Sequence, residues 1–379
     1  MNESIYLDYN ATTPIDPEVA DAILPWITTH FGNPSSSHEY GRTAKKAVDR
    51  AREQVAFLLD CEADEIVFTS GGTESNNLAI FGSLRAAPGE RKGIVTSGVE
   101  HPAVARPCDR LETEGYTVSR LPVDAGGQVN AEDGISSVSR NTALVTVMLA
   151  NNETGTIQPV RDLSRIAHDA GALIHTDAAQ AVGKIPVRVS DLGIDFLSIA
   201  GHKLYAPKGV GALYIRRGSK IRPFSLGAGH EFGLRPGTEN VPFIVGLGTA
   251  CEIAGRNMAE VSERLRSLRD MLHGLLVAEV PGIHLNGHLR ERLPNTLNVS
   301  FPNALGRRIL DLSPGISAST GSACHAGVDT PSDVLMAMGA DAETALGAVR
   351  LSLGHGISEE QVETAAQALI QAWRKARTI

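Results

Sequence analysis

An aspartate and a lysine each follow a strand-like run of the chain, at the point where the run ends. Asp177 comes shortly after the apolar run 172–174, and Lys203 comes shortly after the next such run, 195–197. A lysine amine can form an imine with an aldehyde, and a carboxylate can keep a pyridine nitrogen protonated so that the ring accepts electrons. Together these residue types are what pyridoxal 5'-phosphate (PLP) chemistry needs.

Each of the two residues also has an ordinary explanation. A lysine in a solvated loop and an aspartate that caps a turn would account for Lys203 and Asp177 taken singly. Their placement at consecutive strand ends, with His175 and His202 close by, favours a cofactor site instead.

The stretch 70–77 (Ser-Gly-Gly-Thr-Glu-Ser-Asn-Asn) follows a strand-like run and opens a helix-like one. Gly71 and Gly72 would let the backbone approach an anion, and a helix N-terminus offers free N–H groups to bind it. Thr73 could add a hydroxyl. The stretch therefore predicts a phosphate site; a glycine-rich turn with a capping threonine is the alternative.

Two more strand ends carry polar side chains. His101 lies just beyond the run 94–97 and could stack on a flat heterocycle and move protons, although a single histidine is more often structural. Asn151 and Asn152 follow the most apolar run, where their amides suit hydrogen bonds to a ring hydroxyl or a substrate carboxylate. They could equally form a turn.

One cysteine and one arginine near the C-terminus complete the candidates. Cys324 lies in a run of small residues, 318–327, which cannot bury much apolar area and so predicts a mobile, exposed loop. The cysteine could be a nucleophile whose thiolate His325 favours, or an incidental surface thiol. Arg350 could bind a substrate carboxylate or form an ordinary ion pair.

The composition describes an ordinary globular protein. The chain has 379 residues, of which 42% are hydrophobic and 21% charged, and this length suffices for two domains or for one large domain with a smaller one. The net charge of -8 argues against a nucleic-acid-binding surface. No apolar stretch approaches the ~20 residues of a membrane span, and no secretory signal is present, so we expect a cytoplasmic protein. The cysteines form no Cys-x-x-Cys pair, which disfavours disulfides and a zinc site, and no metal is expected.

Strand-like and helix-like runs alternate through the first two thirds of the chain. The strand candidates are short and apolar almost throughout: 66–69, 93–96, 144–149, 172–175, 196–199 and 211–215. Such runs predict a mainly parallel sheet with helices on both faces and with ligands at the carboxyl ends of its strands.

The pattern changes after about residue 255. A long amphipathic helix is predicted over 258–280, followed by strand candidates at 297–300 and 349–352 and a last helix capped by Ser358. We therefore expect three parts, which are an N-terminal segment that joins the small domain, a large PLP-binding domain, and a small α+β domain that carries the Cys324 loop. Their bounds are 1–20, 21–255 and 256–379.

These residues, taken in order, resemble the cysteine desulfurases, a family of class V, fold-type I PLP-dependent enzymes. The similar segments span nearly the whole chain: 7–14, 32–36, 71–75, 100–101, 151–153, 177–180, 201–203, 235–240 and 321–324. The resemblance implies an α/β fold, with a mainly parallel seven-stranded sheet between helices in the large domain and a smaller α+β C-terminal domain.

The resemblance also implies a role for each candidate residue. Lys203 would hold PLP, Asp177 would pair with its pyridine nitrogen, and His101 would stack on the ring and move protons. Arg350 would bind the substrate carboxylate, and Cys324 would attack the substrate sulfur. The remaining contacts to the cofactor would come from Gly72, Thr73, Asn152 (which would also bind the substrate carboxylate), Gln180, His202 and, from the second subunit of a homodimer, Thr238.

The implied reaction converts L-cysteine to L-alanine and leaves the sulfur on Cys324 as a persulfide, for an acceptor protein or scaffold such as one of iron–sulfur cluster assembly. Ala200 stands where many members have a serine, which leaves one hydroxyl contact to the phosphate open. The Ala-Cys-His triplet 323–325 is similar to selenocysteine lyases, so release of selenium from L-selenocysteine is one alternative. Another class V aminotransferase-like enzyme is the second. Because the chain stops at Ile379, the extension by which some desulfurases dock a scaffold is expected to be missing.

Overall fold

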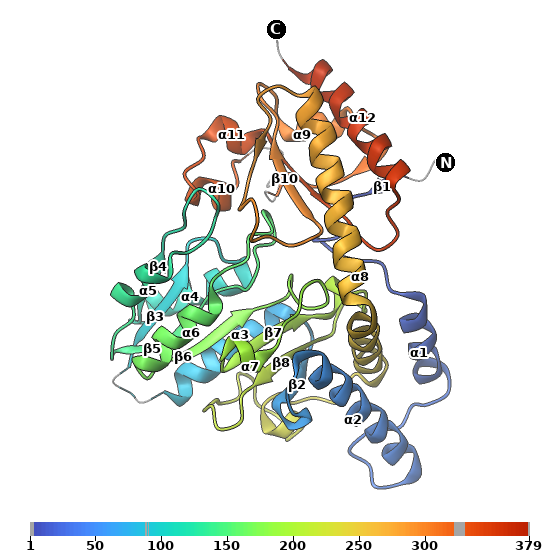
Figure 1. The fold of residues 1–379 in the computed structure, drawn as a ribbon. Helices are drawn as coiled ribbons and strands as arrows, with labels where there is room; N and C mark the ends of the chain where they lie inside the picture. Colours follow the sequence, from blue (N-terminus) through green and yellow to red (C-terminus); the bar gives the residue numbers. More distant parts are fainter. Residues whose placement is uncertain (1–3, 88, 90, 322–329, 378–379) are drawn as a thin grey trace.

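A seven-stranded sheet lies at the centre of the larger part of the molecule (Figure 1). The computed structural model describes residues 4–87, 89, 91–321 and 330–377. The strands follow the order β2-β8-β7-β6-β5-β3-β4. Their bounds are Ile66–Thr69 (β2), Gly93–Ser97 (β3), Thr117–Leu121 (β4), Thr142–Thr146 (β5), Leu173–Asp177 (β6), Phe196–Ala200 (β7) and Gly211–Ile215 (β8). β8 alone runs in the opposite direction to the other six strands of this sheet, so the predicted mainly parallel seven-stranded sheet is confirmed.

Two strands of this sheet differ most from the sequence prediction. β4 was not predicted, because it is an edge strand with exposed residues such as Thr117 and Arg120 and has no continuous apolar run. β5 ends at Thr146, although the apolar run continues beyond it. The N–H of Val147 donates to the His175 carbonyl at 3.2 Å, and the N–H of Leu149 donates to the Asp177 carbonyl at 2.9 Å. The length of the apolar run therefore indicates that the chain stays buried beyond the carboxyl end of β5, and it does not give the length of the strand.

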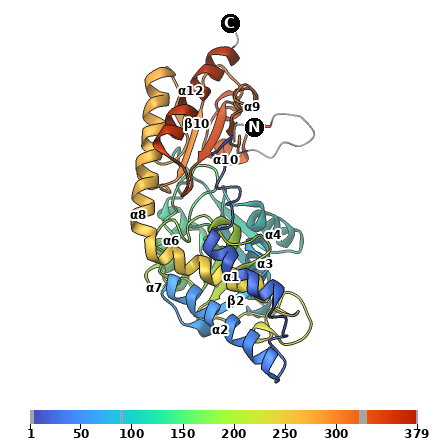
Figure 2. The same cartoon turned by 90° about the vertical axis from the view of Figure 1, so that its right-hand side faces the viewer.

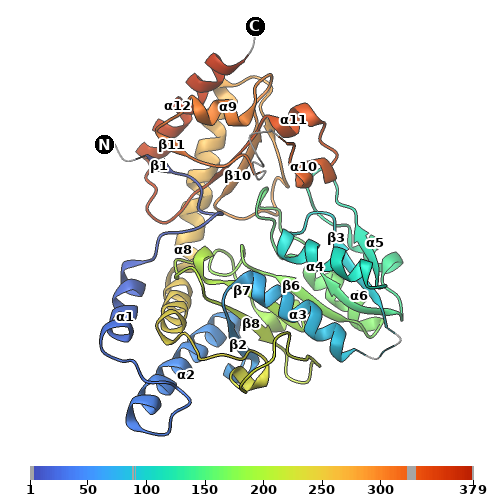
Figure 3. The same ribbon diagram turned by 180° about the vertical axis from the view of Figure 1, so that it is seen from behind.

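Helices cover both faces of this sheet (Figures 1 and 3). Their bounds are Pro17–Thr28 (α1), Glu39–Leu59 (α2), Gly72–Ala86 (α3), Pro102–Thr113 (α4), Ala131–Ser137 (α5), Val160–Asp169 (α6) and Val189–Leu192 (α7). Ile94 and Leu144 are buried in a cluster with side chains of α3 and α4. Their chain neighbours Val95 and Val145 are buried in another cluster with side chains of α6. Because adjacent strand residues point to opposite faces, the continuous apolarity of these strands follows from burial on both sides.

One long helix, α8 (Val241–Glu279), runs beside both parts of the molecule (Figure 2). Side chains of its first half, such as Leu247, pack with α2 in the core of the large sheet, whereas Leu268 and Leu276 pack in a second core. The prediction placed the start of this helix too late. Glycines lower helix propensity in the first half, but a Cβ at Gly248 would lie 2.6 Å from Cα of Ala51, so close helix packing explains the glycine. The predicted boundary at residue 255 falls inside α8, and the division into domains stays a prediction.

The second core contains a three-stranded antiparallel sheet of order β12-β10-β9. The elements beyond α8 are β9 (His284–Leu285), β10 (Thr296–Ser300), α9 (Gly306–Asp311), β11 (Ile316–Ser317), α10 (Asp333–Ala337), α11 (Ala342–Leu346), β12 (Ala348–Ser352) and α12 (Glu359–Ala376). The N-terminal strand β1 (Ile5–Tyr6) pairs with β11, and Leu7 is buried in this second core. Ser358 caps α12 as predicted, with its hydroxyl accepting from the N–H of Gln361. No helix in the described part of the chain is long and apolar enough to cross a membrane.

Candidate active site

A cavity of about 290 Å³ lies where the chain leaves the carboxyl ends of several strands of the large sheet. It collects most of the residues singled out from the sequence, which lie far apart along the chain. The lining residues among them are Gly72, Thr73, His101, Asn152, Asp177, Gln180, His202, Lys203 and Arg350. The parallel arrangement of β6 and β7, with Asp177 opposite Ser198, brings the aspartate and the lysine to the same edge.

Lys203 ends a short 3-10 turn that directly follows β7. Its Nζ donates to the carbonyl oxygens of Asn10, at 2.6 Å, and of Ala11, at 2.7 Å. Burial lowers the pKa of Lys203 to about 8, and the charge of Arg350 acts in the same direction, whereas Asp177 and Asp8 oppose it. A lysine of this pKa has much more free amine near neutral pH than an ordinary lysine, and the free amine is the form that attacks an aldehyde.

Asp177 is the last residue of β6 and is only 7% exposed. Its Oδ1 accepts from the N–H of Ala179 at 2.9 Å, and its Oδ2 accepts from Nδ2 of Asn76 at 2.6 Å. Asn76 is fully buried on α3, and the sequence analysis gave it no role. The sequence did indicate a position near the site, because Asn76 lies one helical turn after Gly72 and Thr73 in the predicted phosphate segment.

The N-terminus of α3 opens into the cavity at Gly72 and Thr73. Gly71 precedes it with φ of +145°, a conformation that favours glycine. A Cβ at Gly72 would lie 3.2 Å from the Cβ of Ala200, so small residues line this end of the cavity. The free N–H groups of the first helical turn therefore face a space that could hold an anion.

Two histidines lie on different walls of the cavity. His101 caps α4, and its Nδ1 accepts from the N–H of Ala103 at 3.1 Å, so a neutral ring carries its proton on Nε2. Desolvation lowers the pKa of His101; Asp177 opposes this shift and Lys203 adds to it. Nδ1 of His202 lies 3.2 Å from Oγ1 of Thr12, and burial together with nearby cations lowers the pKa of His202 to about 4. Both rings are therefore neutral at physiological pH.

Arg350 supplies a buried positive charge on the β12 side of the cavity. The residue is 6% exposed, and its Nη2 donates to Oδ1 of Asp8 at 2.7 Å. Its Nη1 donates to the carbonyl of Asn152 at 3.1 Å. Its Nε is buried without a hydrogen-bond partner among the described residues. One nitrogen of the guanidinium, Nε, is thus left without an acceptor among the described residues. The ion pair left open in the sequence analysis is formed with Asp8.

The two asparagines of the segment 151–153 have different surroundings. Oδ1 of Asn151 accepts from the N–H groups of Glu153, at 2.8 Å, and Thr154, at 2.9 Å, and so forms the turn. Asn152 lines the cavity. Asn151 therefore forms the turn, and the binding role of Asn152 stays a prediction.

Comparison with known proteins identifies the family. The family model Aminotransferase class-V matches residues 5–364. A cysteine desulfurase of Trichormus azollae is 48% identical over 377 residues, which cover 99% of this chain and 94% of that protein. The cysteine desulfurase NifS of Azotobacter vinelandii is 48% identical over 362 residues, 95% of this chain and 90% of that protein. The chain belongs to the cysteine desulfurase family. A solved structure described as a NifS-like protein superposes with a TM-score of 0.92 at 38% identity, covering 98% of this chain and 100% of its own.

Membership in the desulfurase family confirms the predicted family and the fold class. It also makes the chain a class V enzyme, and PLP dependence is a property of that family. The same relatives support the predicted L-cysteine desulfurase activity.

Two predicted residues of this desulfurase, Thr238 and His175, do not line the cavity. Cys324 falls outside the described residues. Thr238 is exposed, and nearby Arg235 forms an ion pair with Glu74 of α3, with Nε and Oε1 2.9 Å apart. His175, which supported the cofactor interpretation, does not line the cavity. Its Nδ1 lies 2.8 Å from Oγ1 of Thr146 and its Nε2 lies 3.0 Å from Oγ of Ser198, so it links three strands in the interior.

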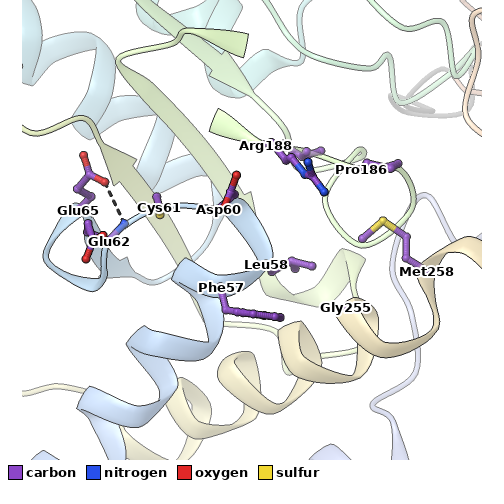
Figure 4. Close-up of a pocket in the computed structure, with 11 residues that line it drawn as sticks. Phe57, Leu58, Asp60, Cys61, Glu62, Glu65, Pro186, Arg188, Gly255 and Met258 are labelled. Carbon is purple, nitrogen blue, oxygen red and sulfur yellow. Dashed lines mark hydrogen bonds between the residues drawn. The ribbon is translucent and has the colours of Figure 1, made fainter. Parts of the chain in front are cut away.

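A larger cavity, of about 740 Å³, lies between the end of α2, the segment 186–188 and α8 (Figure 4). Its lining combines apolar side chains with the carboxyl groups of Asp60, Glu62 and Glu65 and the guanidinium of Arg188, and it contains no lysine or histidine. Burial and these acidic neighbours raise the pKa of Cys61 to about 12, which keeps its thiol protonated. None of the predicted site residues lines this cavity, so size does not identify the chemistry here.

Proposed function

We propose that this chain is a PLP-dependent L-cysteine desulfurase that converts L-cysteine to L-alanine and keeps the sulfur as a persulfide on Cys324. One observation carries the proposal, which is that a single cavity gathers an amine, a buried carboxylate, a neutral histidine and a buried guanidinium: Lys203, Asp177, His101 and Arg350. The family relationship supports the reaction type.

The groups that line the cavity fit PLP. The open N-terminus of α3 suits a phosphate, with Thr73 and His202 beside it, and the small residues Gly72 and Ala200 leave room for it. The buried carboxylate of Asp177 suits a protonated pyridine nitrogen, and Lys203 suits the aldehyde. When bound, PLP supplies an electron sink for the pair of electrons released at the substrate α-carbon.

The chain's own residues would then bind substrate and move protons. Arg350 and Asn152 would bind the carboxylate of L-cysteine, because Nε of Arg350 is a buried donor without a partner among the described residues. Nζ of Lys203 would take the α-proton, since its lowered pKa favours the free amine. His101 would hold a proton at Nε2. The thiolate of Cys324 would bond to the substrate sulfur as the carbon–sulfur bond breaks.

The assembly and the partners belong to the same proposal. We propose a homodimer in which Thr238 contributes to the phosphate site of the other subunit, and its exposure outside its own cavity is in keeping with that role. We further propose transfer of the persulfide sulfur to an acceptor protein or scaffold, such as one of iron–sulfur cluster assembly. A cytoplasmic location stays a prediction.

Turnover of two substrates by the parent and by Cys324→Ala tests the activity. We expect the parent to form alanine and sulfide from L-cysteine in the presence of a reductant, and the variant to lose this activity. A variant that keeps its turnover of L-cysteine would contradict the proposed role of the thiol. Strong turnover of L-selenocysteine with negligible turnover of L-cysteine would instead favour the selenocysteine lyase suggested by the triplet 323–325.

A further inference from the structure

A second lysine lies beside the cavity and has no part in the function proposed above. Lys184 follows β6 and is partly buried. Its Nζ donates to Oε1 of Gln180 at 2.8 Å and to Oδ1 of Asn10 at 3.2 Å. Lys184 and Lys203 also line the same small void of about 20 Å³ next to the main cavity. Among the described residues Lys184 forms no ion pair with a carboxylate, so its hydrogen bonds go to two amide oxygens.

Those two amides are themselves among the most buried polar groups near the cavity. Gln180 is 5% exposed and Asn10 is 1% exposed. Nε2 of Gln180 donates to the carbonyl of Asn10 at 2.9 Å, and this same carbonyl accepts from Nζ of Lys203. Nδ2 of Asn10 donates to the carbonyl of Asn152 at 3.2 Å. Asn10 thus connects Lys184 and Gln180 with Lys203 and Asn152.

The direction of these hydrogen bonds depends on the lysine. The oxygen and nitrogen of a primary amide are close in size, so hydrogen-bond partners decide which of them faces a given side. A lysine amine offers N–H donors, and Lys184 therefore holds the oxygen of Gln180 on its own side. The NH₂ group of Gln180 then faces the carbonyl of Asn10 and keeps a second N–H available on the side of the cavity that Gln180 lines.

We propose that Lys184 is a positioning residue that holds the amide of Gln180 with its N–H groups toward Asn10 and the cofactor cavity. The inference rests on the proposed PLP site, because Gln180 would use its second N–H for the ring oxygen of the cofactor. Loss of the Lys184 amine would leave the oxygen of a buried amide without its donor and would loosen Gln180. Burial, with Lys203 and Arg350 acting in the same direction, lowers the pKa of Lys184 well below its usual value, and a neutral amine still has two N–H groups for its two acceptors.

The test compares PLP binding by Lys184→Met, Gln180→Ala and the double variant. We expect Lys184→Met to weaken PLP binding about tenfold, the size of one lost hydrogen bond. If Lys184 acts through Gln180, the affinity of the double variant for PLP should be no lower than that of whichever single variant binds PLP less tightly. Lys184→Gln, which keeps an NH₂ donor, should recover part of the affinity. Lys375→Met, on α12 away from the cavity, is the matched control and should not change it.

A spectroscopic readout separates this role from general loss of structure. The pH midpoint of the visible absorbance of bound PLP should shift in the same direction in Lys184→Met and in Gln180→Ala. Fully additive losses of affinity, or an affinity of Lys184→Met within twofold of the parent with an unchanged midpoint, would overturn the inference. If Lys184→Met fails to fold, the same comparison is made with Lys184→Gln. Borohydride treatment of the parent comes first, since absence of a PLP label on Lys203 would overturn the proposed function itself.

Discussion

Two cavities of the molecule differ in size and in chemistry, and the smaller of the two is the candidate active site. The cavity of about 740 Å³ beside α2 and α8 is lined by apolar side chains, three carboxyl groups and Arg188, and its thiol, Cys61, is kept protonated. The cavity of about 290 Å³ at the sheet edge collects opposite charges and groups with shifted pKa values, including Lys203. The comparison indicates that a reactive site is recognised by convergent polar groups and not by volume.

The origin of the difference lies in the backbone. Parallel strands bring the chain segments that follow them to one edge of the sheet, so residues distant in sequence meet there. The larger cavity forms instead where a helix end, a loop and a second helix leave space between them. Five substitutions test this difference.

The largest effect is expected for Lys203→Ala. Removal of the amine eliminates the group that would hold PLP and move the α-proton, so desulfurase activity should fall by about a thousandfold or more. Steady-state formation of alanine from L-cysteine measures the loss, and borohydride reduction followed by peptide mapping shows whether a PLP label is still present. A variant with near-parental activity would remove the basis for placing the active site at the carboxyl ends of the strands.

The next effect is expected for Asp177→Asn, which keeps the shape of the side chain and removes its charge. Because the carboxylate would hold the pyridine nitrogen protonated, activity should fall by about a hundredfold while the fold is kept. Asn76→Ala removes the 2.6 Å hydrogen bond to Asp177 and should give a smaller loss. Equal activity of parent and Asp177→Asn, measured with saturating PLP, would argue against that role for the carboxylate.

A moderate effect on stability is expected for Glu100→Gln, next to His101. Burial raises the pKa of Glu100 to about 8, although the Ser97 hydroxyl and the Met148 N–H donate to its carboxyl. Below pH 4.5 this carboxyl is protonated in both the folded and the unfolded chain. As the pH rises from about 4.5 to 8, only the unfolded chain releases the proton, so the free energy of unfolding falls.

The parent should therefore lose stability between pH 5 and pH 8 relative to Glu100→Gln, by an amount on the order of a few kcal/mol. Urea unfolding of both proteins at the two pH values measures the difference. The same pH dependence in both proteins would mean that Glu100 ionises normally in the folded state.

The smallest effect is expected in the larger cavity. Cys61→Ser replaces a partly buried, protonated thiol with a hydroxyl and should leave desulfurase activity within about twofold of the parent. The same assay used for Lys203→Ala applies. A large and specific loss of activity, with unchanged thermal unfolding, would show that the two cavities are not chemically separate.

The sequence by itself predicted the family, the mainly parallel sheet and most of the residues of the cavity. Continuous apolar runs indicated strands buried on both faces, and polar residues after those runs indicated a site at their carboxyl ends. Asp177 and Lys203 could be paired in this way because parallel neighbouring strands end at the same edge. These predictions rest on local pattern, which the chain displays directly.

Only the tertiary structure decided the contacts that cross between distant segments. Asn10 and Lys184 look like ordinary polar residues in the sequence, and although Asn76 lies in the predicted phosphate segment, nothing local shows which carboxylate or amide each of the three meets. His175 lies in the same pattern as Asp177, yet side chains of neighbouring strands bind it in the interior. The physical reason is that hydrogen-bond partners and desolvation depend on packing, which brings together groups that no sequence spacing relates.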